Sequence, residues 1–331
     1  MDPRGFPTTL PEFQKVFPNE SACARYLEKM RWPEGFKCPK CATSGPPYRF
    51  PSRKSVVLRC KRCNSNASLT AGTVMERTHT RLFTWFWAAY LVTTQTPGQS
   101  AVQFQRQLGL SRYETAFQIL HKLRAGMIRP ERDPIGGEYP VEVDECFIGG
   151  TNNKTVVVGA VEVRDRKNAD KVDDRLRHGY VAAVPSRKLV YAGRLRLRVT
   201  DGRSASELVA FVNQNVAKGT VIRTDDAKSY KTLPGFYYEH QPLKVTGDIA
   251  KLEGHLPMIH LVFSNLKTWI LGTHHGRIES HHLQAYLNEY TYRFNRRFYP
   301  MTAFNSVLGL AAKSEAPTYK ELYSQEWIHP N

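Results

Sequence analysis

The chain has 331 residues, with 47 Lys and Arg against 30 Asp and Glu, so its formal net charge at pH 7 is +17. This length allows two or three domains with cores of their own and excludes a single small module. No stretch approaches the ~20 apolar residues that span a bilayer, and the N-terminus lacks the layout of a signal peptide. We therefore expect a cytoplasmic protein whose positive charge favours a long polyanion, DNA, as its partner.

The predicted first domain, residues 1–75, combines a short helical lead-in with a metal site. Two Cys-x-x-Cys pairs, 18 residues apart, have the spacing of two tight knuckles that each give two thiolates to a tetrahedral Zn²⁺ ion. In a reducing compartment such pairs favour metal over disulfides. We predict a zinc ribbon whose structural zinc ion is held by Cys38, Cys41, Cys60 and Cys63. The basic knuckle residues, which are candidate DNA contacts, are Lys40, Lys61 and Arg62.

The predicted second region, residues 76–133, is helical and contains a helix-turn-helix pattern. Gly109 lies at the turn between two apolar-periodic segments, and Ser111 is a natural N-cap for the second helix. Such a second helix reads the major groove of DNA in many regulators, whereas the alternative is an ordinary pair of packed helices with solvated charges. On the first interpretation the second helix turns outward the side chains of Arg112, Tyr113, Thr115, Gln118, Lys122 and Arg124.

The predicted catalytic domain spans residues 134–305 and is followed by a tail, residues 306–331. It begins with Pro-Ile-Gly-Gly at 134–137, which has the composition of a linker. The expected strands are at about 139–148, 155–164, 179–183 and 188–199, and the charged run from 164 to 178 is expected to form an exposed hairpin loop.

A helix is expected to begin near Ser204, and a further strand is expected to end at Asp225 before two or three closing helices. Three antiparallel-type strands, a helix, a strand and a helix follow the order of a ribonuclease H core. The predicted fold class is therefore a multidomain α+β protein: a zinc ribbon and a helical DNA-binding region, then a ribonuclease H-like α/β catalytic domain.

Two aspartates at strand ends are the main catalytic candidates. Val141 and Val143 alternate onto one face of the first strand, so Asp144 points to the other, and Asp225 ends a later strand. Carboxylates on neighbouring strands can hold two divalent cations roughly 3.5–4 Å apart, one at the attacking and one at the leaving oxygen of a phosphodiester. We therefore predict Mg²⁺ or Mn²⁺ at Asp144 and Asp225.

Three other carboxylates compete with this pair. Glu142 and Glu145 flank Asp144, and we interpret both as solvated residues or ion-pair partners, although Glu145 is also a candidate to support the metal site indirectly. Asp226 follows Asp225 and has an alternative explanation as a helix N-cap.

The third catalytic position falls on a predicted helix. An apolar stripe on residues 259–270 leaves His260 and Lys267, seven residues or nearly two turns apart, on a different face. His260 can bind a metal ion, although histidine suits Mg²⁺ less well than Mn²⁺ or Zn²⁺. Lys267 can hold a phosphate of the scissile strand. Glu289 and Glu145 remain open as alternatives for the third metal ligand, and a salt bridge to Arg293 would equally explain Glu289.

At these residues the chain resembles bacterial insertion-sequence transposases of the DDE type, the group with an N-terminal zinc ribbon and an ISXO-like ribonuclease H-like domain. The resemblance covers nearly the whole chain. It begins at Trp32, in WPEGFKCPKC, and is carried by the motifs VDECFIGG (143–150), TDDAKSY (224–230), SNLKTWILGTHHG (264–276) and HLQAYLNEYTYRFNRR (282–297). Within SNLKTWILGTHHG, the segment Thr273-His274-His275 is expected either to position flanking DNA or to cap a helix.

The resemblance implies a metal-dependent polynucleotidyl transferase that excises and inserts its own DNA element. The family's catalytic aspartates correspond to Asp144 and Asp225. Its third acidic position, which is known to vary in this group, corresponds to His260, with Lys267 seven residues on. The resemblance further implies binding to terminal inverted repeats and target DNA, a homodimer or larger assembly on DNA, and DNA contacts from Arg296 and Arg297. A catalytically inactive DNA-binding protein and a structure-specific nuclease are the alternatives.

Overall fold

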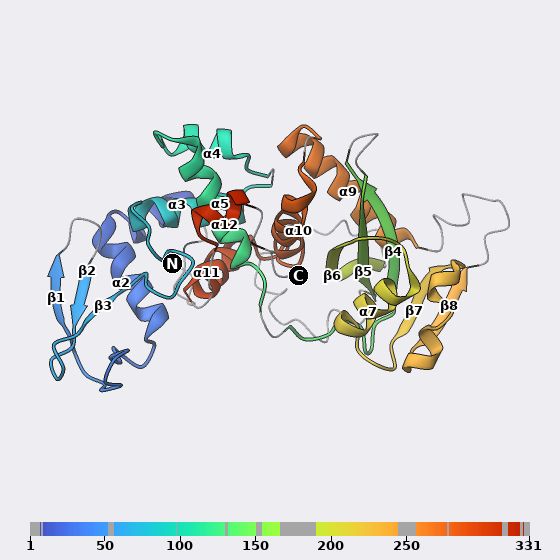
Figure 1. The fold of residues 1–331 in the computed structure, drawn as a ribbon, viewed down its shortest axis with the longest axis horizontal. Coiled ribbons are helices and arrows are strands. Elements are labelled where there is room, and N and C mark those ends of the chain that lie inside the picture. Colours follow the sequence, from blue (N-terminus) through green and yellow to red (C-terminus); the bar gives the residue numbers. More distant parts are fainter. Residues whose placement is uncertain are drawn as a thin grey trace. The chain divides into compact units, whose positions relative to one another are not determined.

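The structure is a computed structural model. It describes residue 7 and residues 9–51, 56–96, 98–129, 132–149, 154–165, 190–243, 256–276, 278–312, 317–324 and 327. The chain divides into two compact units (Figure 1). The first unit contains residues 1–129 and 300–330, and the second contains residues 130–299. The predicted strand at 179–183 and most of the predicted loop at 164–178 lie outside the described residues.

Helix α3 (Leu82–Thr94) forms the centre of the first unit. It is apolar on all sides, and nine of its 13 residues are buried. Around it lie α1 (Leu10–Val16), α2 (Glu20–Arg31) and α11 (Pro300–Ala311), which share an aromatic core. The ring centroid of Phe17 lies 4.9 Å from that of Phe86 and 5.7 Å from that of Phe304. The helix that begins at Pro300 therefore completes the core that the first hundred residues begin.

The zinc-ribbon segment folds as an antiparallel sheet in the order β1 (Tyr48–Pro51), β2 (Val56–Arg59) and β3 (Asn66–Ser68). Its strands are short, and Leu58 and Ala67 are its buried side chains, so it has little apolar core of its own. A sheet of this size needs another source of stability, which the cysteines supply below.

The helix-turn-helix pattern forms α4 (Ala101–Gln107) and α5 (Tyr113–Ala125), which pack together. Gly109 has φ +60°, so the turn lies where the sequence predicts it. The predicted cap is wrong: α5 is preceded at its N-cap by Arg112, which makes no side-chain cap hydrogen bond, and not by Ser111. A short helix, α12 (Tyr319–Ser324), also belongs to this unit, and Phe117 of α5 lies against Tyr323.

The second unit is built on a five-stranded sheet in the order β6-β5-β4-β7-β8. The antiparallel strands are β4 (Val141–Ile148), β5 (Thr155–Asp165) and β6 (Val190–Thr200), while β7 (Val221–Asp225) and β8 (Glu239–Leu243) continue the sheet in parallel with β4. The predicted adjacency of the strands that carry Asp144 and Asp225 is therefore confirmed, but the predicted strand-end position of Asp144 is wrong, because β4 continues to Ile148.

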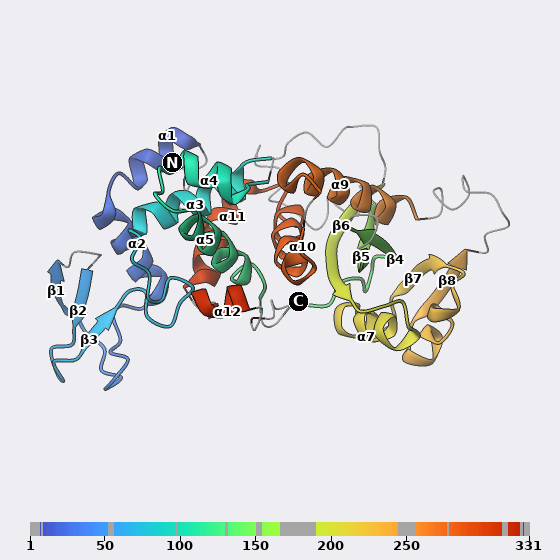
Figure 2. The ribbon, with the colours of Figure 1, turned by 45° about the horizontal axis from the view of Figure 1, so that its top comes forward.

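Helices cover both faces of this sheet (Figures 1 and 2). Helix α7 (Ala205–Asn215) begins where the sequence predicts it, with Ser204 as its N-cap, and packs on one face with Val141, Val143 and Ile222. Helices α9 (Pro257–His274) and α10 (Ser280–Phe294) pack on the other face with Cys146 and Ile148. Two 3₁₀ turns, Lys228–Tyr230 and Leu233–Phe236, follow β7. Alternation along β4 thus directs Asp144 towards α9.

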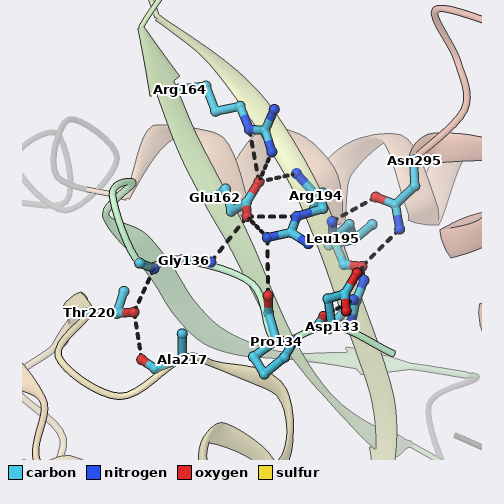
Figure 3. A network of polar contacts seen from close by, with 12 residues as sticks. Asp133, Pro134, Gly136, Glu162, Arg164, Arg194, Leu195, Ala217, Thr220 and Asn295 are labelled. Atoms are coloured by element: carbon cyan, nitrogen blue, oxygen red, sulfur yellow. Dashed lines mark hydrogen bonds and ion pairs between the residues drawn. The ribbon is translucent and has the colours of Figure 1, made fainter. Parts of the chain in front are cut away.

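A buried carboxylate fastens the start of this unit to the sheet (Figure 3). Glu162 of β5 is fully buried and accepts hydrogen bonds from the amides of Gly136 and Arg194, at 3.0 and 2.9 Å. Its two oxygens also pair with the guanidinium groups of Arg164 and Arg194 at 2.7 and 2.8 Å. Gly136 has φ +92°, and a Cβ there would lie 2.6 Å from the Thr220 side chain, so glycine is required. The segment 134–137, predicted as a linker, is instead packed into the second unit.

Among the described residues, no helix combines the length and apolar character needed to cross a membrane.

Candidate active site and zinc centre

The four predicted zinc ligands converge in the first unit. The Sγ atom of Cys38 lies 3.6 Å from that of Cys63, and the Sγ atom of Cys41 lies 3.6 Å from that of Cys60. All four sulfur atoms lie within 4.8 Å of one another. Thiolates bound tetrahedrally at ~2.3 Å from one zinc ion lie about 3.8 Å apart, whereas a disulfide requires about 2.05 Å. The arrangement is that of a Cys₄ zinc site.

The knuckle backbones place these thiols. The amide of Ala42 donates to the carbonyl of Cys38 at 2.9 Å, and the amide of Asn64 donates to the carbonyl of Cys60 at 3.0 Å. Ala42 and Asn64 both have positive φ, at +55° and +57°. The two loops are therefore equivalent turns that each present two sulfur atoms, as the sequence spacing predicts.

The catalytic candidates lie on neighbouring strands of the second unit's sheet, Asp225 at the end of β7 and Asp144 midway along β4, which continues to Ile148. Asp144 is a half-buried residue of β4, and its Oδ2 lies 3.1 Å from Nε2 of His260 on α9. Asp225 ends the neighbouring strand β7. Burial raises the pKa of the Asp225 carboxyl, the amide of Ala227 opposes that rise, and the charge of Asp144 adds to it. The two aspartates are thus close enough for their charges to interact.

Glu145, the residue after Asp144 on β4, is a third carboxyl group in this region. Its side chain is buried, and its Oε1 lies 3.4 Å from Nε of Arg203. Burial raises the pKa of Glu145 to about 7; Arg203 opposes the rise, and the charges of Asp144 and Asp225 add to it. The ion-pair partner predicted for Glu145 is therefore present. Arg203 lies in the loop after β6, and no local pattern in the sequence marks it as part of this group.

Glu142 connects the strand of Asp144 to the helix of His260. The prediction of a solvated or ion-paired residue is wrong, because Glu142 is 1% exposed and its Oε2 accepts the amides of Met258 and Ile259 at 2.8 and 2.9 Å. A carboxylate at a helix N-terminus satisfies free amides and complements the helix dipole. Glu142 thus holds the first turn of α9, which carries His260, against the strand that carries Asp144.

Two family models match the chain in the regions just described. The transposase zinc-ribbon domain matches residues 18–66, and the ISXO2-like transposase domain matches residues 135–295. Both models describe the IS1595 family, and together they include the zinc centre and the carboxylate site. The chain belongs to the IS1595 family of transposases. The predicted family and α+β fold class, with its zinc ribbon and ribonuclease H-like domain, are therefore confirmed.

The remaining comparisons add little to this assignment. No curated protein matches the transposase. Among solved structures, a chain in the cryo-EM structure of the simian T-cell lymphotropic virus intasome in complex with PP2A regulatory subunit B56 gamma is similar, with 14% identity and a TM-score of 0.29. The match covers 55% of the transposase and 63% of the intasome chain. A TM-score at this level supports no argument about fold or function.

The carboxylate site of the transposase fits the divalent cations that its family implies. Asp144 and Asp225 lie on neighbouring strands, the charges of both act on the Glu145 carboxyl, and the neighbouring Arg203 is half-exposed. Burial is the main cause that raises the pKa values of Asp225 and Glu145, and nearby carboxylates add to the rise, so a bound cation would favour the ionised forms. Hard divalent cations bind such oxygen donors and would supply the missing positive charge.

The structure also places Glu289, the other carboxylate considered for the third position, the segment 273–275 and Asp226, the rival of Asp225. Glu289 of α10 is fully buried, and its Oε1 accepts from Nη1 of Arg293 at 3.1 Å, which is the salt bridge considered from the sequence. In the segment 273–275, His275 is the left-handed C-cap of α9, with φ +53°, and the His274 ring lies against those of Trp269 and Tyr286. Asp226 is exposed and caps no helix, because Ala227 precedes the 3₁₀ turn. The N-cap explanation of Asp226 is therefore wrong.

The predicted DNA contacts divide into exposed and engaged side chains. The residues that are exposed, and so accessible to a ligand, are Lys40, Lys61, Arg62, Arg112, Tyr113 and Lys267. Gln118 and Thr115 are half-buried on α5. The Lys61 ammonium lies over the Tyr48 ring at 5.2 Å, and the Arg62 guanidinium donates to Thr43 at 3.2 Å.

Four of the predicted contacts are committed to packing within their own unit. Arg124 is 2% exposed and donates to the Gln99 carbonyl, so its predicted outward orientation is wrong. Lys122 is half-buried and donates to the Glu76 carbonyl at 3.3 Å. The Arg296 guanidinium lies 3.8 Å from the Tyr292 ring centroid. Arg297 lies over the Phe294 ring, and burial lowers its pKa to about 10.

Proposed function

We propose that this transposase binds the terminal inverted repeats of its DNA element and catalyses metal-dependent strand cleavage followed by strand transfer. The observation that carries the proposal is that His260 lies 3.1 Å from Asp144, whose strand β4 is the neighbour of β7, the strand that ends at Asp225. The family supplies the transposase class, and this geometry supports a site that acts on phosphodiesters. The protein would work in the cytoplasm in association with DNA.

Asp144, Asp225 and His260 are the residues that would hold the catalytic Mg²⁺ or Mn²⁺ ions. When bound, two such ions supply Lewis-acid stabilisation of the attacking and leaving oxygens. Imidazole is a better ligand for Mn²⁺ than for Mg²⁺, so a histidine at the third position favours activity with Mn²⁺. Glu142 keeps His260 in place by holding the first turn of α9.

Lys267 is placed to hold the DNA. It lies seven residues after His260 on α9, so the two side chains leave the helix in nearly the same direction, about 10 Å apart along its axis. Lys267 is exposed, as a phosphate ligand must be. Its ammonium would bind a phosphate of the scissile strand and keep the reacting phosphodiester in line with the attacking oxygen.

Recognition of the element's ends falls to the first unit in this proposal. The exposed knuckle residues Lys40, Lys61 and Arg62 would contact phosphates, and α5 would present Arg112 and Gln118 to base edges. The structural zinc ion would hold the knuckles in register. Because two ends must be joined, a dimer or larger assembly on DNA is expected.

The proposal is tested by incubating the full chain with labelled element-end DNA in Mg²⁺ or Mn²⁺ and separating cleaved from joined products. Strands with new 3′-hydroxyl ends, followed by their joining to target DNA, are expected. Cleavage without joining would indicate the nuclease alternative. Specific end binding without cleavage in either metal would indicate a DNA-binding protein that has lost catalysis and would overturn the proposal.

A further inference from the structure

A second group of metal-binding side chains lies at the start of α10. Nε2 of His281 is 3.0 Å from Nε2 of His282 and 3.3 Å from Oε2 of Glu279. All three donor atoms lie within 4.8 Å of one another. The group is separate from the catalytic candidates, because His260 lies 14 residues, or about 21 Å of helix, before the end of α9 at His274.

The separations of His281 Nε2 from the other two donors are those of ligands on one ion. Two donors bound at ~2.0–2.1 Å to a first-row metal lie about 2.9–3.4 Å apart. A hydrogen bond between the rings is the alternative, but Nε2 of His281 carries at most one proton and approaches both His282 and Glu279. One proton cannot serve both neighbours well, whereas a cation bound between the donors satisfies all three.

The orientation of Glu279 supports the same interpretation. Glu279 is the N-cap residue of α10, yet its side chain makes no cap hydrogen bond to the amides of its own helix. It turns instead to the imidazole of His281. Both imidazoles are half-buried, so they are held in place and still accessible to an ion.

We propose that Glu279, His281 and His282 form a second transition-metal site, distinct from the zinc ribbon and from the catalytic centre. Two imidazoles and one carboxylate suit Zn²⁺ or a similar borderline cation, while Mg²⁺ prefers oxygen ligands and keeps its water. The ion would fasten the beginning of α10, whose Leu283 and Leu287 belong to the core that also buries α9. The site therefore stabilises the support of the helix that carries His260 and Lys267.

The test counts zinc bound by the full chain after metal is removed with a chelator. All chains carry Asp144→Asn and His260→Ala, so that the catalytic ligands do not add to the count, and this parent chain is expected to bind two equivalents, the first at the Cys₄ site and the second at the α10 site. The double variant His281→Ala/His282→Ala is expected to bind one, and Glu279→Gln to weaken the second equivalent at least tenfold. His275→Asn is a matched control, since it removes a nearby exposed histidine and tolerates the same left-handed backbone.

Cobalt substitution shows which site is filled. The sulfur-to-cobalt charge-transfer band should appear unchanged in the double variant, which also confirms that its first unit is folded. The parent chain and the His275→Asn control, but not the double variant, should gain a further rise in thermal midpoint with the second equivalent. A single equivalent in the parent chain, or a second equivalent that persists in the folded double variant, would overturn the proposal. Neither result would bear on DNA cleavage.

Discussion

The carboxylate of Glu162 and the carboxylates of Asp225 and Glu145 lie in the same sheet, but the protein shifts their pKa values in opposite directions. Glu162 is fully buried, and burial acts to raise its pKa, but the amides of Arg194 and Gly136 and two guanidinium groups outweigh that effect and lower it. At the other group, the pKa values of Asp225 and Glu145 are raised by burial, and nearby carboxylates add to the rise. Pairing therefore outweighs burial at Glu162, whereas burial outweighs pairing at Asp225 and Glu145, where added positive charge would favour the ionised forms.

This difference distinguishes a carboxylate that stabilises the fold from carboxylates that form a functional site. A buried carboxylate with every oxygen satisfied fixes the fold, and its removal is felt in stability. Carboxylates held together against their mutual repulsion are typical of sites that bind cations and act on substrates. The four variants below are ordered from the largest expected effect to the smallest, and each changes one carboxylate to its amide.

Asp144→Asn should abolish DNA cleavage and leave the fold intact. The amide keeps the size of the side chain but removes the charge that the catalytic cations require, so we expect a loss of at least about a thousandfold in single-turnover rate, or about 4 kcal/mol. End-DNA binding by gel shift should stay within about threefold of wild type. Cleavage near the wild-type rate would remove Asp144 from the site.

Glu162→Gln should lower the stability of the fold. It leaves the Arg164 and Arg194 guanidinium groups without their buried partner, so urea unfolding should show a loss of about 3–5 kcal/mol. Because the folded-state pKa of Glu162 is lowered, this stabilisation is present above the unfolded value of about 4.3 and disappears as the pH falls through the folded-state pKa. The exposed Glu239→Gln is the control and should change stability by less than about 0.5 kcal/mol.

Glu142→Gln should moderately lower both the stability of the fold and the rate of DNA cleavage. The amide can still accept from Met258 and Ile259, but it loses the charge that complements the α9 dipole, so a loss of about 1–2 kcal/mol is expected. Cleavage should fall about tenfold, because α9 positions His260 against Asp144. A normal cleavage rate in a destabilised variant would limit Glu142 to a structural role.

Glu145→Gln should have the smallest effect, and it should depend on pH. Since the folded-state pKa is raised to about 7, ionising Glu145 costs stability as the pH rises from its unfolded value of about 4.3 to above 7. Without added divalent cations, the variant should therefore melt about 2–4 °C higher than wild type at pH 8, as expected for about 1 kcal/mol, and at the same temperature at pH 4. An equal difference at both pH values would contradict the assigned cause.

Local spacing in the sequence was sufficient for the zinc centre and for the strands of the catalytic sheet. The two Cys-x-x-Cys pairs predict the knuckles because each knuckle is a local turn. The strands that carry Asp144 and Asp225 follow from alternation, and the stripe on α9 is confirmed, because Ile259, Val262 and Leu266 are buried. These features depend on neighbours a few residues apart along the chain.

The features that the sequence did not reveal depend on partners far along the chain. Glu142 meets the amide of Met258 116 residues later, and Arg124 is buried against the carbonyl of Gln99. Arg203 reaches Glu145 across 58 residues. From its local sequence alone, a charged side chain is predicted to be solvated. The prediction is wrong when a partner far along the chain allows that side chain to be buried. The same limit applies to α11, which joins the core of the first unit.

The most direct test of the account compares two neighbouring aspartates. Asp225→Asn and Asp226→Asn make the same chemical change at adjacent positions, and single-turnover cleavage of element-end DNA in Mg²⁺ and Mn²⁺ would be measured for both. We predict that Asp225→Asn loses at least about a thousandfold, or about 4 kcal/mol, while Asp226→Asn, whose carboxylate is exposed, stays within about threefold of wild type. Equal losses in the two variants, or cleavage that survives Asp225→Asn, would contradict a catalytic centre built on Asp144 and Asp225.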